Sequence, residues 1–329
     1  MKYSQLQGFS KQVFIGSFIA VFLITTLQHF KVTPQALIRP TPTSEQIFRD
    51  VQGRLENYRN TFEVRKPHQL IPQTEAAGEY ENAKSYALID LTTGEVLKEK
   101  ALSVRIPIAS LTKIMTAVVS LDLAKPDEYI TITKEASEQI PTKIGVVPGE
   151  RMKISELLEA LLLTSANDSA QAIVDGINEK YGDAVFIRAM NAKAAYIGLT
   201  DTHFTNPQGF DSQDHYSSAE DMAVLTQYAL THYPFIAEIV KKDYAFLPAD
   251  AFHKQFDLYN WNGLLGVYPN VSGVKIGNTD DAGRTTIVVS KRSDVTLLTI
   301  VLGAPGIIER DLWAAELLDE GFAEKAGLR

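Results

Sequence analysis

Strand-like segments near both ends of the chain, with helical segments between them, constrain the fold more than any other feature. Residues 85–91 and 96–98 are short apolar runs around a Gly-containing turn, which predicts a hairpin. Near the other end, three strand-like runs joined by short turns predict an antiparallel meander: 271–276, 285–291 and 296–302. We therefore expect one antiparallel sheet of about five strands, built from both chain ends and flanked by helices, with an inserted, mostly helical subdomain.

Composition excludes several functional classes. The chain has 329 residues and is 45% hydrophobic, so it can bury a substantial core. Its net charge of -8 disfavours a nucleic-acid partner, because phosphate binding requires clustered Lys and Arg. It contains no cysteine, which rules out thiol catalysis, disulfides and thiolate zinc sites. None of the six histidines has ligand spacing to another, so we expect no metal and no cofactor.

The N-terminal segment predicts a membrane anchor. Residues 12–30 contain no Asp, Glu, Lys or Arg, and Lys2 and Lys11 precede them. The segment is long enough to span a bilayer, and no small-x-small cleavage site follows it, which favours an uncleaved signal anchor over a cleaved signal peptide. A buried core helix is the alternative, but the segment is apolar all round and terminal. Because Lys31 and Arg39 nearly balance the charges before the segment, its orientation stays open at this point.

The order of these segments suggests three parts. Residues 1–31 form a stub with the transmembrane anchor. Residues 32–80 form a tether, since Pro34, Pro40 and Pro42 favour extended chain. Residues 81–329 contain all the strand and helix signals described above and form the folded domain.

Ser110 and Lys113 form a candidate nucleophile and base. They lie three residues apart at the head of the apolar run 114–119, so on a helix they share a face. An amine in that position can take the proton from a hydroxyl that is otherwise a poor nucleophile. The alternative is a solvent-facing first turn in which Ser110 is only a helix cap.

Two further segments have the chemistry that acyl transfer needs. Ser165 and Asn167 occupy a polar break between two apolar helical runs, so their side chains can point the same way into a cleft. Taken alone, the segment Asn167-Asp168-Ser169 is better explained as the cap of the next helix. Lys275 lies on the first meander strand between Gly273 and Gly277. The glycines indicate close approach of another backbone, such as a peptide substrate, while the alternative is an edge-strand lysine that blocks aggregation.

The order Ser-x-x-Lys, Ser-x-Asn, Lys-x-Gly resembles the low-molecular-weight penicillin-binding proteins, the serine-type D-alanyl-D-alanine carboxypeptidase family of the penicilloyl-serine transferase superfamily. The resemblance runs in order from about residue 85 to 322 and includes segments 106–116, 161–170, 190–194, 202–211 and 216–223. It implies a β-lactamase/transpeptidase-like fold and a catalytic domain over 81–329. It also implies a bacterial protein whose substrate lies outside the cytoplasm. The catalytic domain is therefore expected to be extracytoplasmic, with the segment 12–30 as its single-pass anchor in the cell membrane. The expected partners are the peptidoglycan stem peptide and, as covalent inhibitors, β-lactam antibiotics.

The resemblance also implies a role for each motif residue. Ser110 would attack the carbonyl between two terminal D-alanines, with Lys113 as general base and no metal. Ser165 and Lys275 would pass the proton to the leaving D-alanine, and Asn167 would hold the amide on the acyl side. Backbone N–H groups of Ser110 and Asn278 would form the oxyanion hole. The segment expected to bind substrate comprises Ile276, Gly277, Asn278 and Thr279.

Several residues depart from the family pattern. Ile276 stands where the family usually has a threonine whose hydroxyl binds the substrate carboxylate, and the loss of such a bond is worth roughly 1.5–3 kcal/mol. Thr296 stands where an arginine is expected, and Gln208 replaces a frequent histidine. The alternatives are therefore a DD-endopeptidase acting on cross-links, or a catalytically impaired peptidoglycan-binding homologue. A β-lactamase is disfavoured because we identify no deacylating glutamate.

Overall fold

The computed structural model describes residues 78–328. The anchor predicted at 1–31 and nearly all of the tether predicted at 32–80 lie outside these residues. Among the helices between residues 78 and 328, none is both long enough and apolar enough to cross a membrane.

The predicted sheet is confirmed. It has five strands in the order β2-β1-β9-β8-β7, and every neighbouring pair is antiparallel. The strands are β1 (Ser85–Asp90), β2 (Glu95–Lys100), β7 (Val271–Thr279), β8 (Gly283–Arg292) and β9 (Val295–Ala304). The two ends of the chain meet where β1 pairs with β9, with Ala87 opposite Ile300. β7 is an edge strand, so one side of it is free of strand pairing.

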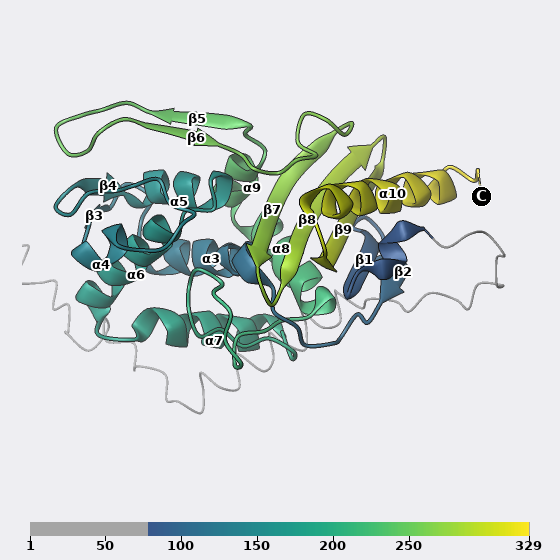
Figure 1. Ribbon diagram of the computed structural model, residues 1–329, viewed down its shortest axis with the longest axis horizontal. Helices are drawn as coiled ribbons and strands as arrows, with labels where there is room; N and C mark the ends of the chain where they lie inside the picture. The colour runs from purple at the N-terminus through teal and green to yellow at the C-terminus, as the bar shows by residue number, and fades with distance from the viewer. Residues whose placement is uncertain (1–77, 329) are drawn as a thin grey trace, which may run out of the picture. The chain divides into compact units, whose positions relative to one another are not determined.

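Both faces of the sheet are covered (Figure 1). Side chains on β1 alternate between the two faces, as a strand requires. Tyr86 and Leu88 join a cluster with Trp313 and Leu317 of α10 (Ile307–Lys325), whereas Ala87 joins the larger cluster formed with the helical segment. In Figure 1, α10 lies in front of β8 and β9, and α8 (Ala219–His232) lies behind the strands.

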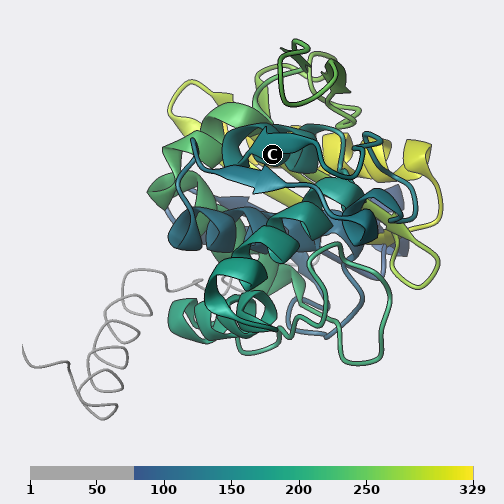
Figure 2. The same ribbon diagram turned by 90° about the vertical axis from the view of Figure 1, so that its left-hand side faces the viewer.

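The inserted segment between β2 and β7 is mostly helical, and its teal helices face the viewer in Figure 2. It also holds two small antiparallel pairs, β3–β4 and β5–β6. Its helices are η3 (Ala109–Thr112), α3 (Lys113–Leu123), α4 (Lys134–Ser137), α5 (Ile154–Leu163), α6 (Asn167–Tyr181), α7 (Val185–Ile197), α8 and α9 (Pro234–Val240). The short strands are β3 (Tyr129–Thr131), β4 (Arg151–Lys153), β5 (Tyr244–Leu247) and β6 (Phe256–Tyr259), and a 3₁₀ turn, η2 (Glu79–Asn82), precedes β1.

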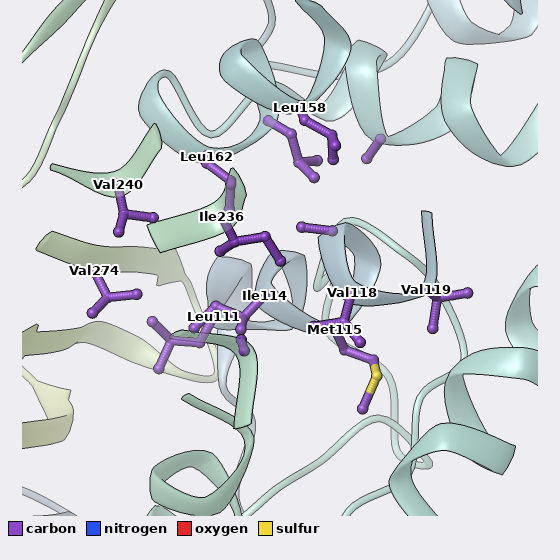
Figure 3. Packing of buried hydrophobic residues seen from close by; sticks show 14 of the residues in the cluster. Leu111, Ile114, Met115, Val118, Val119, Leu158, Leu162, Ile236, Val240 and Val274 are labelled. Carbon is purple, nitrogen blue, oxygen red and sulfur yellow. The ribbon is translucent and has the colours of Figure 1, made fainter. Parts of the chain in front are cut away.

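Helix α3 forms the centre of the larger cluster. All residues from Lys113 to Ser120 are buried, so the helix is enclosed on every side. Figure 3 shows Ile114 of α3 and Leu111 of η3 among side chains of α5, α9 and β7, including Leu162, Ile236 and Val274. A helix packed on all sides has little freedom to shift, so the residues at its N-terminus are held in fixed positions.

Two details differ from the pattern that the sequence predicts. Ser155 precedes the apolar run 157–162, so the sequence predicts that it caps this helix. Helix α5 instead begins at Ile154, and the Glu156 carboxylate caps it by accepting a bond from the Lys153 backbone N–H at 2.7 Å. The helical period of residues 308–318 predicts a buried stripe of Ile308, Leu312, Ala315 and Leu318, but Ile308 and Leu312 are 71% and 58% exposed in α10. The stripe that packs on the sheet comprises Trp313, Ala314, Leu317, Leu318 and Phe322.

Candidate active site

The predicted nucleophile and base are in contact. Ser110 lies in the 3₁₀ turn η3 and Lys113 is the first residue of α3, so side chains three residues apart stack on one another. Lys113 Nζ lies 2.8 Å from Ser110 Oγ. The alternative of a solvent-facing first turn is excluded, because Lys113 is fully buried.

The Lys113 amine has two further partners, both of them oxygen acceptors. Nζ donates to Asn167 Oδ1 at 2.8 Å and to the backbone carbonyl of Gln208 at 2.7 Å. A neutral amine has two N–H groups and one lone pair. When the two N–H groups bind these oxygens, the lone pair is left facing Ser110 Oγ. The same carbonyl lies 3.5 Å from Ser110 Oγ, so Nζ is the nearer acceptor for the serine proton.

Burial and neighbouring cations favour the neutral amine. Burial lowers the pKa of Lys113 well below its usual 10.5, and the charge of Lys275 lowers it further, while the Asp168 carboxylate acts in the opposite direction. Burial, with a contribution from Arg310, lowers the pKa of Lys275 to about 7. Lys113 is therefore a better candidate for a general base than an ordinary surface lysine, because its neutral form is favoured.

The Ser165–Asn167 segment forms the turn between α5 and α6. Ser165 has a left-handed backbone with φ of 62°, unusual for a residue with a side chain, which makes the turn tight. Asn167 is bound on both sides: Oδ1 accepts from Lys113, and Nδ2 donates to the Ile140 carbonyl at 3.0 Å. Within residues 78–328, Ser165 Oγ makes no hydrogen bond to Lys275, so the proton relay through these two residues stays a prediction.

Asp168 supports this turn, although sequence reasoning treated it as part of a helix cap. The N-cap of α6 is Ala166, which provides no side-chain bond. The Asp168 side chain is fully buried and accepts backbone N–H bonds from Ile144, Gly145 and Val146 at 3.2, 2.8 and 3.2 Å. It thereby fixes the loop that contains Ile140, which in turn positions Asn167.

The glycines on β7 allow close approach, but the protein's own backbone fills the space. A Cβ on Gly277 would lie 2.9 Å from the backbone nitrogen of Ser110, and one on Gly273 would lie 2.8 Å from the Val240 carbonyl. The predicted close approach of another backbone is confirmed at both glycines, whereas a peptide substrate along this strand edge stays a prediction. Gly277 lets β7 pack directly against the turn that holds the nucleophile, and Lys275 lies buried on the same strand.

The remaining predicted substrate-binding residues follow Lys275 along β7. Ile276 is half-buried and lies opposite Thr286 of β8. Asn278 is exposed, and the Thr279 hydroxyl donates to Asp211 at 2.7 Å. Their backbone continues along the unpaired edge of the sheet, where an extended peptide could add as a further strand.

Arg310 was missed by sequence reasoning. It lies in the first turn of α10 and is 2% exposed, and its guanidinium binds Asp311 at 2.8 Å through Nε. An arginine was expected at position 296, but Thr296 is not close to Lys275. Across the sheet, the residue of β9 that lies level with Lys275 is Ile300, which is four residues from Thr296. The buried cation near Lys275 is thus Arg310, from the helix after the strand, while position 296 has a threonine as the sequence shows.

Gln208 contributes through its backbone. Asn206 Oδ1 accepts from the backbone N–H groups of Gly209 and Phe210 at 2.7 and 2.9 Å, and Thr116 of α3 donates to the Pro207 carbonyl at 2.7 Å. These bonds fix the Gln208 carbonyl beside Lys113. Elsewhere in the described part of the chain, no group of three or more His, Cys, Asp or Glu side chains could hold a metal ion.

Residues 72–306 match the Peptidase S11 family, D-alanyl-D-alanine carboxypeptidase. The chain belongs to this family. The three motifs at the site are the ones on which the resemblance was based.

Similar proteins include carboxypeptidases from distant bacteria. D-alanyl-D-alanine carboxypeptidase DacF of Bacillus subtilis (strain 168) is 33% identical over 249 residues, which are 74% of this chain and 62% of DacF. DacB2 of Mycobacterium tuberculosis is 31% identical over 73% of this chain and 82% of its own length. The crystal structure of the Streptomyces K15 DD-transpeptidase superposes with a TM-score of 0.68 at 27% identity, covering 77% of this chain and 100% of that one.

Proposed function

We propose that this chain is a serine DD-peptidase that removes the terminal D-alanine of peptidoglycan stem peptides through an acyl-enzyme on Ser110. The observation that carries the proposal is the buried Lys113 amine, 2.8 Å from Ser110 Oγ and held by two other acceptors. The names of DacF and DacB2 support the same substrate class, although the chain spans only 62% of DacF.

In the acylation step, Ser110 Oγ attacks the carbonyl carbon of the D-alanyl-D-alanine bond while its proton passes to Lys113 Nζ. The negative charge on the carbonyl oxygen is stabilised by the backbone N–H groups of Ser110 and Asn278. Collapse of the tetrahedral intermediate breaks the C–N bond and leaves an ester on Ser110. The proton that Lys113 accepted then passes through Ser165 and Lys275 to the departing amine, so Lys113 is neutral again, and D-alanine leaves.

In the second step, water attacks the ester carbonyl and gives a proton to Lys113. Lys113 then donates this proton to Ser110 Oγ as the acyl C–O bond breaks, which restores Ser110 and releases the shortened peptide. A β-lactam follows the first step in the same way, because its strained amide also acylates Ser110. Its leaving group stays attached to the acyl portion, so we expect β-lactam antibiotics to be covalent inhibitors.

The substrate's terminal carboxylate requires a cation, and the site provides two that are almost completely buried, Lys275 and Arg310. Charges in a water-poor site interact more strongly than at the surface. We propose that they receive the carboxylate in place of the hydroxyl that Ile276 lacks. This arrangement favours carboxypeptidase activity, while Ile276 favours the second candidate, a DD-endopeptidase whose cross-linked substrate has no free D-alanine carboxylate at that position.

Ile276→Thr is expected to increase carboxypeptidase turnover of a pentapeptide on the order of tenfold, because a hydroxyl adds a bond to a charged group. The measurements are D-alanine release from a pentapeptide and cleavage of a cross-linked dimer into its two stem peptides. Ile276→Val is the matched control, since it has the shape of threonine without the hydroxyl. An equal response to both substitutions would show that the hydroxyl is not the missing contact. Turnover of the cross-linked dimer alone by the wild type would favour the endopeptidase.

We also propose that residues 12–30 anchor the chain in the bacterial cell membrane by a single pass, with the catalytic domain outside the cytoplasm. The apolar character of that segment supports an anchor, and the location of peptidoglycan supports this orientation.

Labelled penicillin tests both proposals on the full chain in intact bacterial cells. We expect a covalent adduct in the membrane fraction, lost in Ser110→Ala and retained in Ser137→Ala, which changes a half-buried serine of α4. A folded protein without an adduct would refute the enzyme and support the impaired, peptidoglycan-binding homologue. An adduct recovered in the soluble fraction would refute the anchor alone.

A further inference from the structure

His215 is a buried histidine without a role in the mechanism described above. It is 2% exposed and lies in the segment that precedes α8. The Thr205 backbone N–H donates to its Nδ1 at 3.1 Å, so Nδ1 has no proton of its own. Burial lowers the pKa of His215 to about 4, which keeps the ring neutral at neutral pH. The proton of the neutral ring is therefore on Nε2.

Nε2 faces the turn that holds the nucleophile. It lies 2.8 Å from Thr112 Oγ1, and the Thr112 hydroxyl donates its own proton to the Ala109 carbonyl at 2.9 Å. The chain of donors thus runs in one direction, from His215 through Thr112 to Ala109. Ala109 immediately precedes Ser110 and has φ of 51°, a left-handed conformation that costs a residue with a side chain free energy and must be stabilised by its surroundings.

The opposite nitrogen of the ring, Nδ1, binds the segment that positions Lys113. Thr205, which donates to Nδ1, begins the stretch 205–210, and this stretch includes the Gln208 carbonyl 2.7 Å from Lys113 Nζ. Its Gly209 packs so closely on the nucleophile turn that a Cβ there would lie 1.9 Å from the Ala109 carbonyl oxygen. His215 therefore bridges the two backbone segments whose relative position sets the distance between Ser110 and Lys113.

We propose that His215 is a positioning residue whose Nε2–H bond to Thr112 holds Ser110 in line with the lone pair of Lys113. The proposal rests on the proposed function, because its kinetic consequence is the rate of Ser110 acylation. Displacing a nucleophile by about 1 Å costs on the order of 100-fold in rate. We expect loss of this bond to slow acylation tenfold to 100-fold, on the order of that effect, without weakening the reversible binding that precedes it.

Two substitutions separate the two ring nitrogens. His215→Gln can place an N–H donor near the position of Nε2, whereas His215→Asn can place an oxygen near Nδ1 and leaves Thr112 without its donor. In stopped-flow acylation by labelled penicillin, we expect Gln to stay within about threefold of the wild type and Asn to lose tenfold to 100-fold in the acylation rate constant, with an unchanged dissociation constant. His203→Asn, a half-buried histidine in the same loop that binds the Asp214 carbonyl, is the control. Equal rates for the Gln and Asn variants would overturn the proposal, as would a loss confined to the dissociation constant.

Thr112 provides a second route to the same bond. Thr112→Val is expected to show the loss and Thr112→Ser to restore the rate, and the double variant His215→Asn with Thr112→Val should lose no more than either single change. A double variant whose loss in acylation rate equals the product of the two single losses would overturn the proposal. If the histidine variants unfold, Thr112→Val and Thr112→Ser alone test the bond.

Crystal structures of the same variants make the test independent of catalysis. We expect Lys113 Nζ and Ser110 Oγ to separate beyond hydrogen-bond distance in Thr112→Val. An unchanged distance would overturn the positioning role even in an active enzyme. Absence of acylation in the wild type would instead refute the proposed function, and the crystal distance would still decide the role of His215.

Discussion

Replacing Lys113 by methionine is expected to slow acylation of Ser110 on the order of 10²–10⁴-fold, the range typical of a lost general base. Methionine has a similar length and fills the same buried space, but it has no lone pair basic enough to accept the serine proton. Asn167 Oδ1 and the Gln208 carbonyl would lose their donor. The measurement is the rate of adduct formation with labelled penicillin, with Lys180→Met, a substitution at the exposed surface of α6, as control.

The pH profile identifies the mechanism behind this loss. Because the pKa of Lys113 is well below 10.5, the neutral amine is present above that lowered pKa and is lost as the pH falls through it. Wild-type acylation should therefore rise with pH along a limb that is absent from Lys113→Met. A methionine variant that acylates at the wild-type rate, or that keeps the limb, would show that another group is the base.

The same burial predicts the effect on stability. The unfolded chain binds a proton at Lys113 up to about pH 10.5, whereas the folded chain releases it at a lower pH. The free energy of unfolding therefore decreases as the pH falls from about 10.5 towards the lowered pKa of the folded state. Lys113→Met removes this titration, so we expect its unfolding temperature to change less between pH 7 and pH 10 than that of the wild type, which differential scanning calorimetry would measure.

Local patterns in the sequence predicted the sheet and the motif residues. Short apolar runs bounded by turn residues predicted the five strands, since both signals lie within neighbouring residues. The spacing of Ser110 and Lys113 predicted their contact because a single turn enforces it. In α10 the periodicity was ambiguous: one apolar stripe contains Ile308 and Leu312 and another contains Trp313 and Leu317, and only the position of the sheet selects the second.

Contacts between distant segments could not be predicted in this way. Gln208 is 95 residues from Lys113 and His215 is 103 residues from Thr112, and each acts through a bond that no local pattern specifies. Arg310 reaches the region of Lys275 only because α10 folds back over the sheet. Asp168 lies beside a motif residue, yet its partners are 22 to 24 residues away in a loop that the sequence alone does not place.

Asp168→Ala is expected to destabilise the folded protein by about 2–4 kcal/mol, because it leaves backbone N–H groups without the charged acceptor they bind in the interior. The affected groups are those of residues 144 to 146, and the loop they hold also provides the Ile140 carbonyl for Asn167 Nδ2. We expect slower acylation together with the loss of stability. Urea unfolding measures the loss of stability, and labelled penicillin measures the acylation rate. Asp183→Ala, at an exposed aspartate after α6, is the control.

Asp168→Asn separates the charge from the hydrogen bonds. It keeps one oxygen acceptor, so it should cost less stability than alanine, but it removes a negative charge that raises the pKa of Lys113. Without that charge the pKa of Lys113 falls further, and the acid limb of the acylation profile should move to lower pH. A limb that stays in place while stability falls would show that Asp168 acts only by holding the loop. A limb that moves would show that the same carboxylate both holds the loop at residues 144–146 and raises the pKa of Lys113.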